Sequence, residues 1–143
     1  MIYKILPFHV VEDIIRDFVE RKHVPAMINE VPVNVEWDYY REISKAGAGF
    51  VVVAMDDNGL CGISGYQVTK NPNNQDEVEA SNVIWSIDKE KSIKAKDFLK
   101  EANGLLKGMG VHKVSFTLCN EKIGRFLSMN GFSKEATVYG VEL

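Results

Sequence analysis

The spacing of apolar residues in the first third of the chain predicts one strand and two helices. Residues 1–6 are rich in β-favouring side chains and Pro7 ends the run, which indicates a short first strand. From 10 to 23 apolar residues recur every three or four positions with charges between them, which predicts an amphipathic helix. Asn34 is a suitable cap for a second helix of similar pattern that ends at Ala46.

The middle of the chain has the pattern of paired strands. The run 50–55 is apolar and β-rich, and Asp57-Asn58-Gly59 supplies residues that tolerate positive φ in a hairpin turn before a strand over 60–69. The polar segment 70–77 contains a proline and three asparagines and is predicted to be an exposed loop. Residues 78–87 are predicted to form the next strand.

Helix and strand patterns alternate in the last third of the chain. The four predicted elements are a long helix with apolar residues recurring from Ala95 to Leu106 and ended by Gly108 and Gly110, a half-buried strand over 112–118, a short helix from Asn120 to Gly131, and a last strand over 135–143. Either Asp88 or Ser92 is expected to cap the long helix. No period of twenty to fifty residues repeats, so a single domain over residues 1–143 is expected.

Composition and charge exclude several classes of protein. Hydrophobic residues make up 45 % of the chain and charged residues 26 %, which excludes disordered and collagen-like chains. Seventeen Lys and Arg against twenty Asp and Glu give a net charge of −3, which argues against binding to nucleic acid or to an anionic membrane. The longest apolar runs, such as 50–55, are far shorter than the roughly twenty residues that cross a bilayer.

Compartment, redox state and metal binding follow from a few residues. Glu12 and Asp13 come before any long apolar stretch, so no signal peptide is indicated and a cytoplasmic protein is expected. Cys61 and Cys119 lie in strand-like apolar runs and are expected to be reduced and buried. The three histidines are far apart, with no cysteine or carboxylate at zinc-like spacing beside them, so no metal is expected.

A motif near the C-terminus resembles a known family. After Gly108-Met109-Gly110 and a strand pattern, the matching positions are Asn120, Ile123, Gly131 and Phe132. Together with the predicted order of elements, this stretch resembles the GNAT superfamily of acyl-CoA-dependent N-acetyltransferases, over most of the chain from residue 10. The resemblance implies an α+β fold, an α/β sandwich whose mixed, mostly antiparallel sheet has splayed central strands. The implied order is strand, two helices, three strands, helix, strand, helix and strand.

The resemblance also implies acetyl-CoA as co-substrate. Active members place glycines before the long helix so that backbone N–H groups approach a pyrophosphate, but the stretch 88–97 contains no glycine. We expect lysines to replace those amides; the alternative is a solvated face in which lysines interleave with Glu90 and Asp97. Trp85 is also interpretable as a core residue. The expected cofactor-binding residues are Trp85, Ser86, Ile87, Lys91, Lys94, Ala95, Lys96 and Asn120.

Acetyl transfer to an amine needs a general base, because the amine is mostly protonated at neutral pH. Members of the family often keep a Glu near the start of the central strand, where this chain has Glu77 and Glu79, and we favour Glu79. The alternative is that these carboxylates only face solvent. Leu127 stands where many members have a tyrosine that protonates the leaving thiolate; Tyr139 is a possible replacement, although an aromatic residue there is also explained by packing.

Three functions remain open on the sequence. The first is an N-acetyltransferase that moves an acetyl group from acetyl-CoA to an unidentified amine, on a small molecule or a protein, in a ternary complex. The second is a GNAT-fold binding or structural protein without CoA chemistry, of a kind encoded by bacteriophages, which the missing glycines and Leu127 favour. The third, an unrelated α+β binding domain, requires central strands that do not splay. A last strand over 136–139 would also offer an edge for a homodimer.

Overall fold

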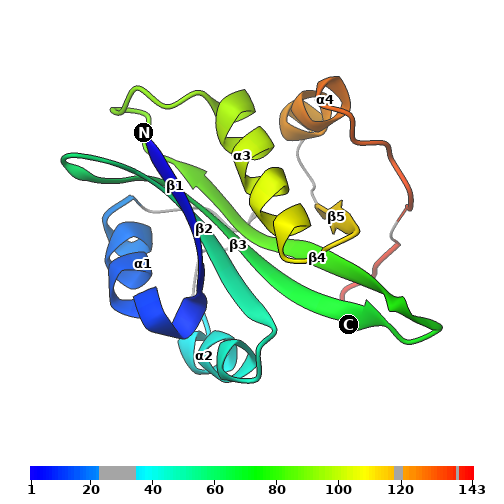
Figure 1. Cartoon of the computed structure of the whole chain (residues 1–143). Coiled ribbons are helices and arrows are strands. Elements are labelled where there is room, and N and C mark those ends of the chain that lie inside the picture. Colours follow the sequence, from blue (N-terminus) through cyan, green and yellow to red (C-terminus); the bar gives the residue numbers. More distant parts are fainter. Residues whose placement is uncertain (23–34, 118–120, 138) are drawn as a thin grey trace.

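The computed structural model describes residues 1–22, 35–117, 121–137 and 139–143 (Figure 1). In these ranges the chain forms a mixed sheet with helices on both faces. The elements are β1 (Ile2–Pro7), α1 (Phe8–Lys22), α2 (Trp37–Lys45), β2 (Gly49–Asp56), β3 (Gly59–Asn71), β4 (Asn74–Ile87), α3 (Ala95–Gly108), β5 (Lys113–Ser115) and α4 (Glu121–Met129). Asn34, the expected cap of the second helix, and Cys119 lie outside the described residues.

The strands lie side by side in the order β1-β2-β3-β4-β5. The neighbouring strands from β1 to β4 are antiparallel. Helices α1 and α2 connect β1 to β2, and hairpins connect β2 to β3 and β3 to β4. β5 is parallel to β4, since α3 carries the chain back across one face of the sheet between them. The expected α+β fold with a mixed, mostly antiparallel sheet is therefore confirmed.

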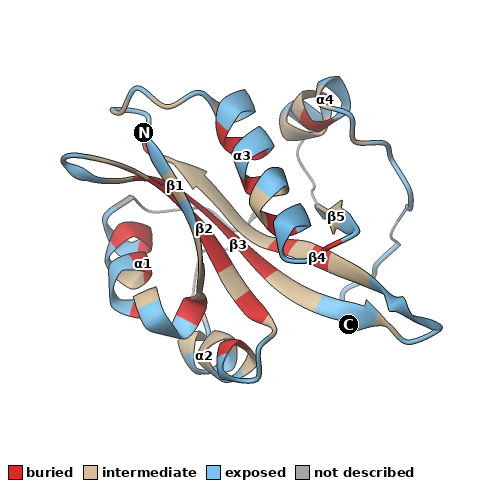
Figure 2. Ribbon diagram, in the orientation of Figure 1, coloured by how far each residue is buried: buried red, intermediate tan, exposed pale blue. Residues whose placement is uncertain are grey.

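Helices cover both faces of the sheet and form two cores. Figure 2 shows the buried residues concentrated on the central strands and on the helix sides that face them. The α1-side core consists of Phe8, Ile15, Phe18, Val19, Val51, Val53 and Ile63. The α3-side core consists of Val52, Ala54, Tyr66, Ala80, Phe98, Ala102, Leu106 and Val111. Alternate residues of one strand thus enter different cores, as the two-residue period of a strand dictates.

An ion pair joins α1 to α2 beside the α1-side core. Glu12 on α1 is only 8 % exposed, and each of its carboxylate oxygens accepts a hydrogen bond of 2.6 Å from the Arg41 guanidinium on α2. Arg16 lies 3.3 Å from the same carboxylate. The hydrogen bond from Arg41 lowers the pKa of Glu12 below its ordinary value. The bidentate geometry fixes the relative orientation of the two helices.

Of the two β-hairpins, one forms as the sequence predicts and the other does not. The turn at 57–59 forms as expected: the Asn58 N–H donates to Asp56 Oδ1 over 2.8 Å, and Gly59 has a φ of 120°. The segment 70–77 is not a loop, because β3 continues to Asn71 and β4 begins at Asn74. Main-chain hydrogen bonds between the two strands sustain this polar extension without apolar burial, and its side chains are exposed as expected.

Two other expectations about element ends are wrong. α3 begins at Ala95 with Lys94 as its N-cap residue and no side-chain cap, so neither Asp88 nor Ser92 caps it. Asp88 Oδ1 instead accepts a hydrogen bond of 3.0 Å from the Glu90 N–H. β5 spans only Lys113–Ser115 rather than 112–118. The turn between β4 and α3 sets the start of α3. The length over which β5 pairs with β4 sets the bounds of β5.

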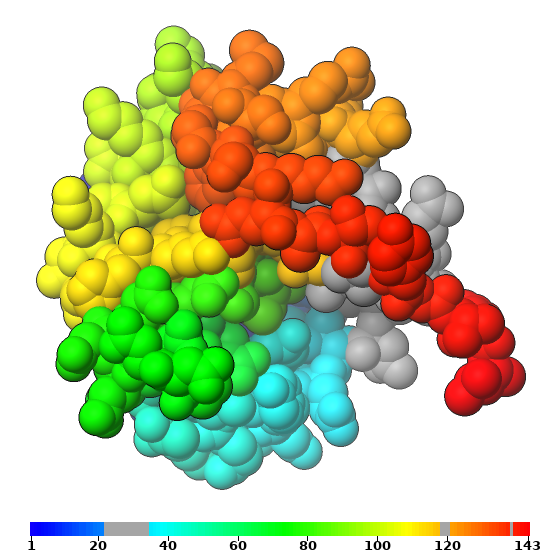
Figure 3. All heavy atoms as spheres, turned by 90° about the vertical axis from the view of Figure 1, so that its right-hand side faces the viewer, coloured from blue at the N-terminus to red at the C-terminus, as the bar shows by residue number. Residues whose placement is uncertain are grey.

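The last predicted strand is also absent from the described residues. Within 132–137 and 139–143 no residue is in a strand, and Tyr139, Val141 and Leu143 are highly exposed. Figure 3 shows this C-terminal segment running over the outside of the molecule with its end standing away from it. Alternation predicted a strand here, but a strand needs a partner edge, and the described residues of this segment pair with no strand.

None of the helices in the described ranges combines the length and apolar character needed to cross a bilayer. Cys61 is buried with a free thiol, as expected, and burial raises the pKa of that thiol.

Candidate functional site

The two central strands β4 and β5 separate soon after they meet. Their pairing consists of Glu79↔Lys113, Ala80↔Val114 and Ser81↔Ser115, whereas β4 continues to Ile87. Beyond Ser81, β4 has no strand partner on that side in the described part of the chain, although it stays paired with β3 on the other. Beyond Ser81, backbone N–H and C=O groups on this side of β4 therefore have no strand hydrogen bonds to the described residues. This separation is the splay that the GNAT resemblance implies and that an unrelated domain would lack.

A β-bulge in β4 lies at the point of separation. Gly65 pairs with Ile84 and Tyr66 with Asn82, so Val83 is an extra residue opposite β3. A bulge bends a strand and increases its twist, which turns the end of β4 away from β5. The bulge lies two residues beyond Ser81, the last residue of β4 that pairs with β5.

The end of β4 that has no partner on the β5 side consists of Trp85, Ser86 and Ile87. These are three of the expected cofactor-binding residues. The Trp85 ring stacks on Phe98 of α3 at 4.9 Å and lies 6.1 Å from Phe116 and 6.4 Å from Phe126 of α4. Its side chain therefore packs between α3 and α4, which supports the interpretation of Trp85 as a core residue.

The start of α3 offers uncapped backbone N–H groups. Lys94, its N-cap residue, has extended backbone angles and gives the helix no side-chain cap. The first bond of the helix runs from the Phe98 N–H to the Lys94 carbonyl over 3.0 Å, so the amides of Ala95, Lys96 and Asp97 precede the helical ladder. Such a helix start carries a partial positive charge and attracts anions.

The three lysines expected at this helix start have different surroundings. Lys91 Nζ lies 3.8 Å from Asp56 Oδ2 on the β2–β3 hairpin, so it is at least partly engaged there. Lys94 and Lys96 are exposed, and the structure records no ion pair for either within the described ranges. Lys94 and Lys96 are therefore the better placed of the three to meet an anion.

Glu79 lies two residues before the point where β4 and β5 separate. It is half-buried, and its neighbour Ala80 belongs to the α3-side core, so Glu79 is on the opposite face of the sheet. Glu77 instead accepts a hydrogen bond of 3.0 Å from Asn71 within the exposed β3–β4 hairpin. Of the two carboxylates, Glu79 is the one next to the separated strands.

The remaining expected residues are brought to no common site. Asn120 lies outside the described residues. Leu127 is buried on α4, where it offers no proton, and Tyr139 is 92 % exposed in the C-terminal segment. Neither packing nor the site accounts for Tyr139 in this position.

A buried polar network of Asn82, Ser64 and Tyr66 lies at the bulge and was not predicted from the sequence. Asn82 Nδ2 donates to Ser64 Oγ over 3.0 Å, and Ser64 Oγ donates to the Tyr66 hydroxyl over 2.7 Å. All three side chains are at least nine-tenths buried, and burial raises the pKa of Tyr66 to about 12. These three residues carry no local signal in the sequence, because only the register of β3 against β4 shows that they meet.

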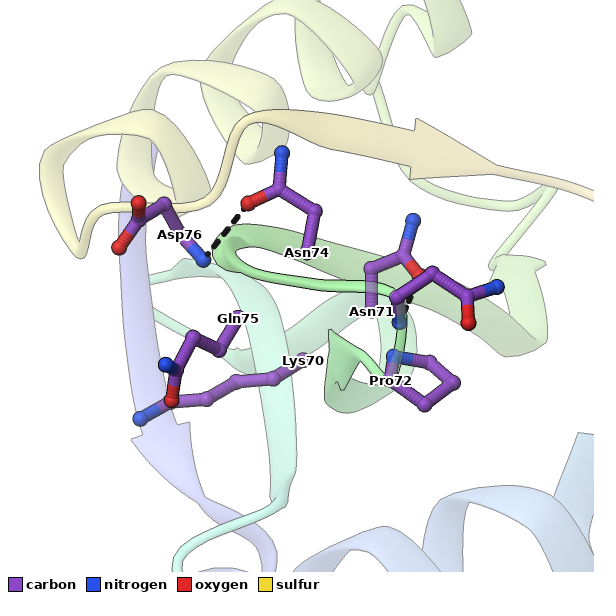
Figure 4. Close-up of a pocket in the computed structure, with 7 residues that line it drawn as sticks. Lys70, Asn71, Pro72, Asn74, Gln75 and Asp76 are labelled. Atoms are coloured by element: carbon purple, nitrogen blue, oxygen red, sulfur yellow. Dashed lines mark hydrogen bonds between the residues drawn. The ribbon is translucent and has the colours of Figure 1, made fainter.

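A hollow at the tip of the β3–β4 hairpin is a weaker candidate. It is lined by Lys70, Asn71, Pro72, Asn73, Asn74, Gln75 and Asp76 (Figure 4). All of these belong to one exposed turn, held by bonds such as Asp76 N–H to Asn74 Oδ1 over 3.2 Å. In the part of the chain that the structure describes, His, Cys, Asp and Glu side chains nowhere gather in threes that could hold a metal ion.

Comparison of the sequence alone finds no family model and no curated protein that matches. The structure is similar to an aminoglycoside acetyltransferase from an uncultured soil metagenomic sample, solved with sisomicin (TM-score 0.70, 13 % identity, 99 % of this chain and 94 % of that one). It is also similar to glucosamine-6-phosphate N-acetyltransferase from Arabidopsis thaliana (TM-score 0.66, 16 % identity, 99 % of each chain).

A third similar structure is that of a predicted acetyltransferase from Clostridium acetobutylicum with acetyl-CoA (TM-score 0.67, 10 % identity, 99 % of this chain and 95 % of that one). The likeness extends to a GNAT family acetyltransferase of Staphylococcus aureus and covers nearly the whole chain in each case. The chain therefore has the GNAT fold.

Proposed function

We propose that this protein is an N-acetyltransferase that transfers an acetyl group from acetyl-CoA to an amine. The observation that carries the proposal is the separation of β4 from β5 beside the uncapped start of α3. One feature offers main-chain hydrogen-bonding groups to an extended arm, and the other attracts phosphate. The GNAT fold, shared with acetyltransferases that include one solved with acetyl-CoA, supports the same activity.

The residues at this site fit acetyl-CoA without the glycines of the family pattern. The amides of Ala95 and Lys96 are uncapped, so backbone donors for a diphosphate are retained, and the exposed ammonium groups of Lys94 and Lys96 add positive charge. The backbone of Trp85 to Ile87 would hold the pantetheine arm, and Asn120 is assigned by the family motif alone. Acetyl-CoA supplies the activated acyl group as a thioester.

The chain's own contribution to chemistry is binding, orientation and removal of a proton. We assign Glu79 as the general base that takes a proton from the acceptor ammonium, directly or through one water. Its place beside the separated strands, on the face opposite α3, lets an amine approach from the α1–α2 side of the sheet. Holding amine and thioester in one site supplies a large part of the rate advantage.

The acceptor is proposed only as an amine. The similar structures include enzymes named for aminoglycosides, for glucosamine 6-phosphate and for a ribosomal-protein alanine, so acceptors on small molecules and proteins are both found on this fold. A net charge of −3 gives no strong preference among them.

Calorimetric titration with acetyl-CoA tests the proposal. We expect a dissociation constant below about 100 μM, which corresponds to roughly 5.5 kcal/mol. The double variant Lys94→Ala/Lys96→Ala should bind more weakly, whereas the matched control Lys100→Ala/Lys107→Ala, which alters exposed lysines farther along α3, should bind as the wild type does. Absence of binding at millimolar acetyl-CoA would refute the proposal. Release of free thiol with a panel of amines then identifies the acceptor.

A second candidate is a GNAT-fold binding or structural protein without CoA chemistry. The packing of Trp85 between α3 and α4 favours it, because that ring occupies space on the side of β4 where α3 begins. The same calorimetry separates the two candidates, since this one predicts no heat of binding with acetyl-CoA.

A further inference from the structure

Asn82 has an amide oxygen with no hydrogen-bond partner. The residue is 8 % exposed, and Oδ1 finds no donor in the described part of the chain. Leaving a buried carbonyl oxygen unsatisfied costs as much as a lost hydrogen bond, so native proteins rarely do so without a ligand, a water or a functional reason. Asn82 is also the first residue of β4 after the pairing with β5 ends.

The orientation of the Asn82 amide is fixed by its nitrogen. Nδ2 lies 3.0 Å from Ser64 Oγ, 3.2 Å from the Gly65 carbonyl oxygen and 3.0 Å from the Ile84 carbonyl oxygen. Carbonyl oxygens only accept, so exchanging the amide nitrogen and oxygen would place Oδ1 against two acceptors. The oxygen therefore faces away from the Gly65 and Ile84 carbonyls.

The Asn82 side chain lies on the same face of the sheet as α3. It pairs in register with Tyr66, which belongs to the α3-side core, and binds Ser64 on that face. Ile87, the end of β4 nearest the turn to α3, is five residues farther on, roughly 15 Å along the strand. The Trp85 ring, three residues beyond Asn82, stacks on Phe98 in the first turn of α3. A pantetheine arm that followed the edge of β4 from this turn would therefore have its thioester end near Asn82.

We propose that Asn82 Oδ1 accepts a hydrogen bond from the secondary amide N–H of acetyl-CoA that is nearer the thioester. This inference rests on the proposed function and deepens it. Because Asn82 Oδ1 can only accept a hydrogen bond, a ligand beside the free edge of β4 must present an N–H group to it. The pantetheine arm has two secondary amides that can do so. The Asn82 nitrogen, held by three acceptors, keeps the oxygen in place before the ligand arrives.

A cycle of one protein change and one ligand change isolates this hydrogen bond. The ligands are acetyl-CoA and its analogue in which the amide nearer the thioester is an ester, which removes the N–H and little else. We expect wild-type protein to bind the ester analogue roughly three- to tenfold more weakly, the effect of one hydrogen bond. Asn82→Leu should bind both ligands equally, and its affinity for adenosine 3′,5′-bisphosphate, which lacks the arm, should match the wild type.

Asn103→Leu on α3 is the matched control, because Asn103 has the other buried amide oxygen without a partner among the described residues. It should keep the wild-type preference for the amide ligand. Equal losses in wild type and Asn82→Leu would overturn the inference alone and leave Oδ1 with an internal water only. Failure of wild-type protein to bind acetyl-CoA would overturn the proposed function and the inference with it.

A wild-type measurement keeps the inference testable if Asn82→Leu does not fold. In ¹⁵N-labelled protein, the side-chain amide resonances of Asn82 should shift with acetyl-CoA and not with adenosine 3′,5′-bisphosphate. Unchanged Asn82 resonances in the presence of saturating acetyl-CoA would overturn the inference.

Discussion

Gly62 on β3 permits α3 to approach the sheet closely, and Gly62→Ala should therefore destabilise the protein. A Cβ atom at this position would lie 2.8 Å from Phe98 Cε2, 3.2 Å from Phe98 Cδ2 and 3.3 Å from Ile93 Cδ1. Carbon atoms pack best at about 3.5–4.0 Å, so the ring must retreat by roughly 0.7 Å. Phe98 is fully buried and stacked on Trp85, which leaves it little room.

The expected loss of stability is about 1–3 kcal/mol, the usual cost of an added methyl group in a packed core. Phe98 lies in the first turn of α3, so its displacement should also weaken acetyl-CoA binding in Gly62→Ala. Gly104→Ala is the control, because nothing lies within 4 Å of a Cβ at that position. Alanine favours a helix over glycine by up to about 1 kcal/mol, so this control should be neutral or stabilising.

Urea unfolding followed by far-UV circular dichroism measures both variants. The midpoint of Gly62→Ala should fall with an unchanged slope, and Phe98→Leu should cost less in the Gly62→Ala background than in the wild type, because both changes act on one contact. A Gly62→Ala midpoint equal to that of the wild type, or additive effects in the double variant, would refute this account of the packing.

Three further predictions concern titratable groups. Because Arg41 lowers the pKa of Glu12, this carboxylate stabilises the fold at neutral pH. The difference in unfolding free energy between wild type and Glu12→Gln, measured by urea unfolding at each pH, should shrink as the pH falls below about 4.3. A difference that stays constant with pH would contradict this role of Glu12. Burial raises the pKa of Tyr66 to about 12, so Tyr66→Phe should remove the last phenolate to appear in an ultraviolet titration; loss of an ordinary one instead would show that Tyr66 is accessible. Glu79→Gln should lower turnover on an identified acceptor by about 10²- to 10⁴-fold while acetyl-CoA affinity is unchanged, with Glu77→Gln as control; full turnover would remove Glu79 from the mechanism.

Local patterns were sufficient for most of the fold. The turn at 57–59 and the apolar spacing over 95–106 depend on neighbours within a few residues, and both elements are present, although α3 begins later than either expected cap implies. The segment 70–77 was misassigned because hydrogen bonds between two strands, which composition does not report, hold its polar residues in a hairpin. The opposite error occurred at 135–143, where alternation was present but the described residues, 135–137 and 139–143, pair with no strand.

The site was less predictable because it depends on how strands pair. Lys94 and Lys96 were identified from charge near a helix start, which is a local signal. Asn82 carried no such signal, since an amide in an alternating strand is unremarkable until the register with Ser64 and Tyr66 is known. The same holds for the bulge at Val83, which exists only relative to β3.

The short length of β5 affects the order in which parts of the protein unfold. Within the described ranges, sheet hydrogen bonds hold the chain from residue 113 onward only along Lys113–Ser115. Beyond that point side-chain contacts hold it, among them those of Trp85 with Phe126 and of Phe116 with Phe132. The side-chain contacts of one short helix are lost together more readily than the hydrogen bonds of a long strand pair. We expect α4 to detach as a separate cooperative unit while β1 to β4 stay folded, and its amide hydrogens to exchange with solvent well before those of β2 and β3.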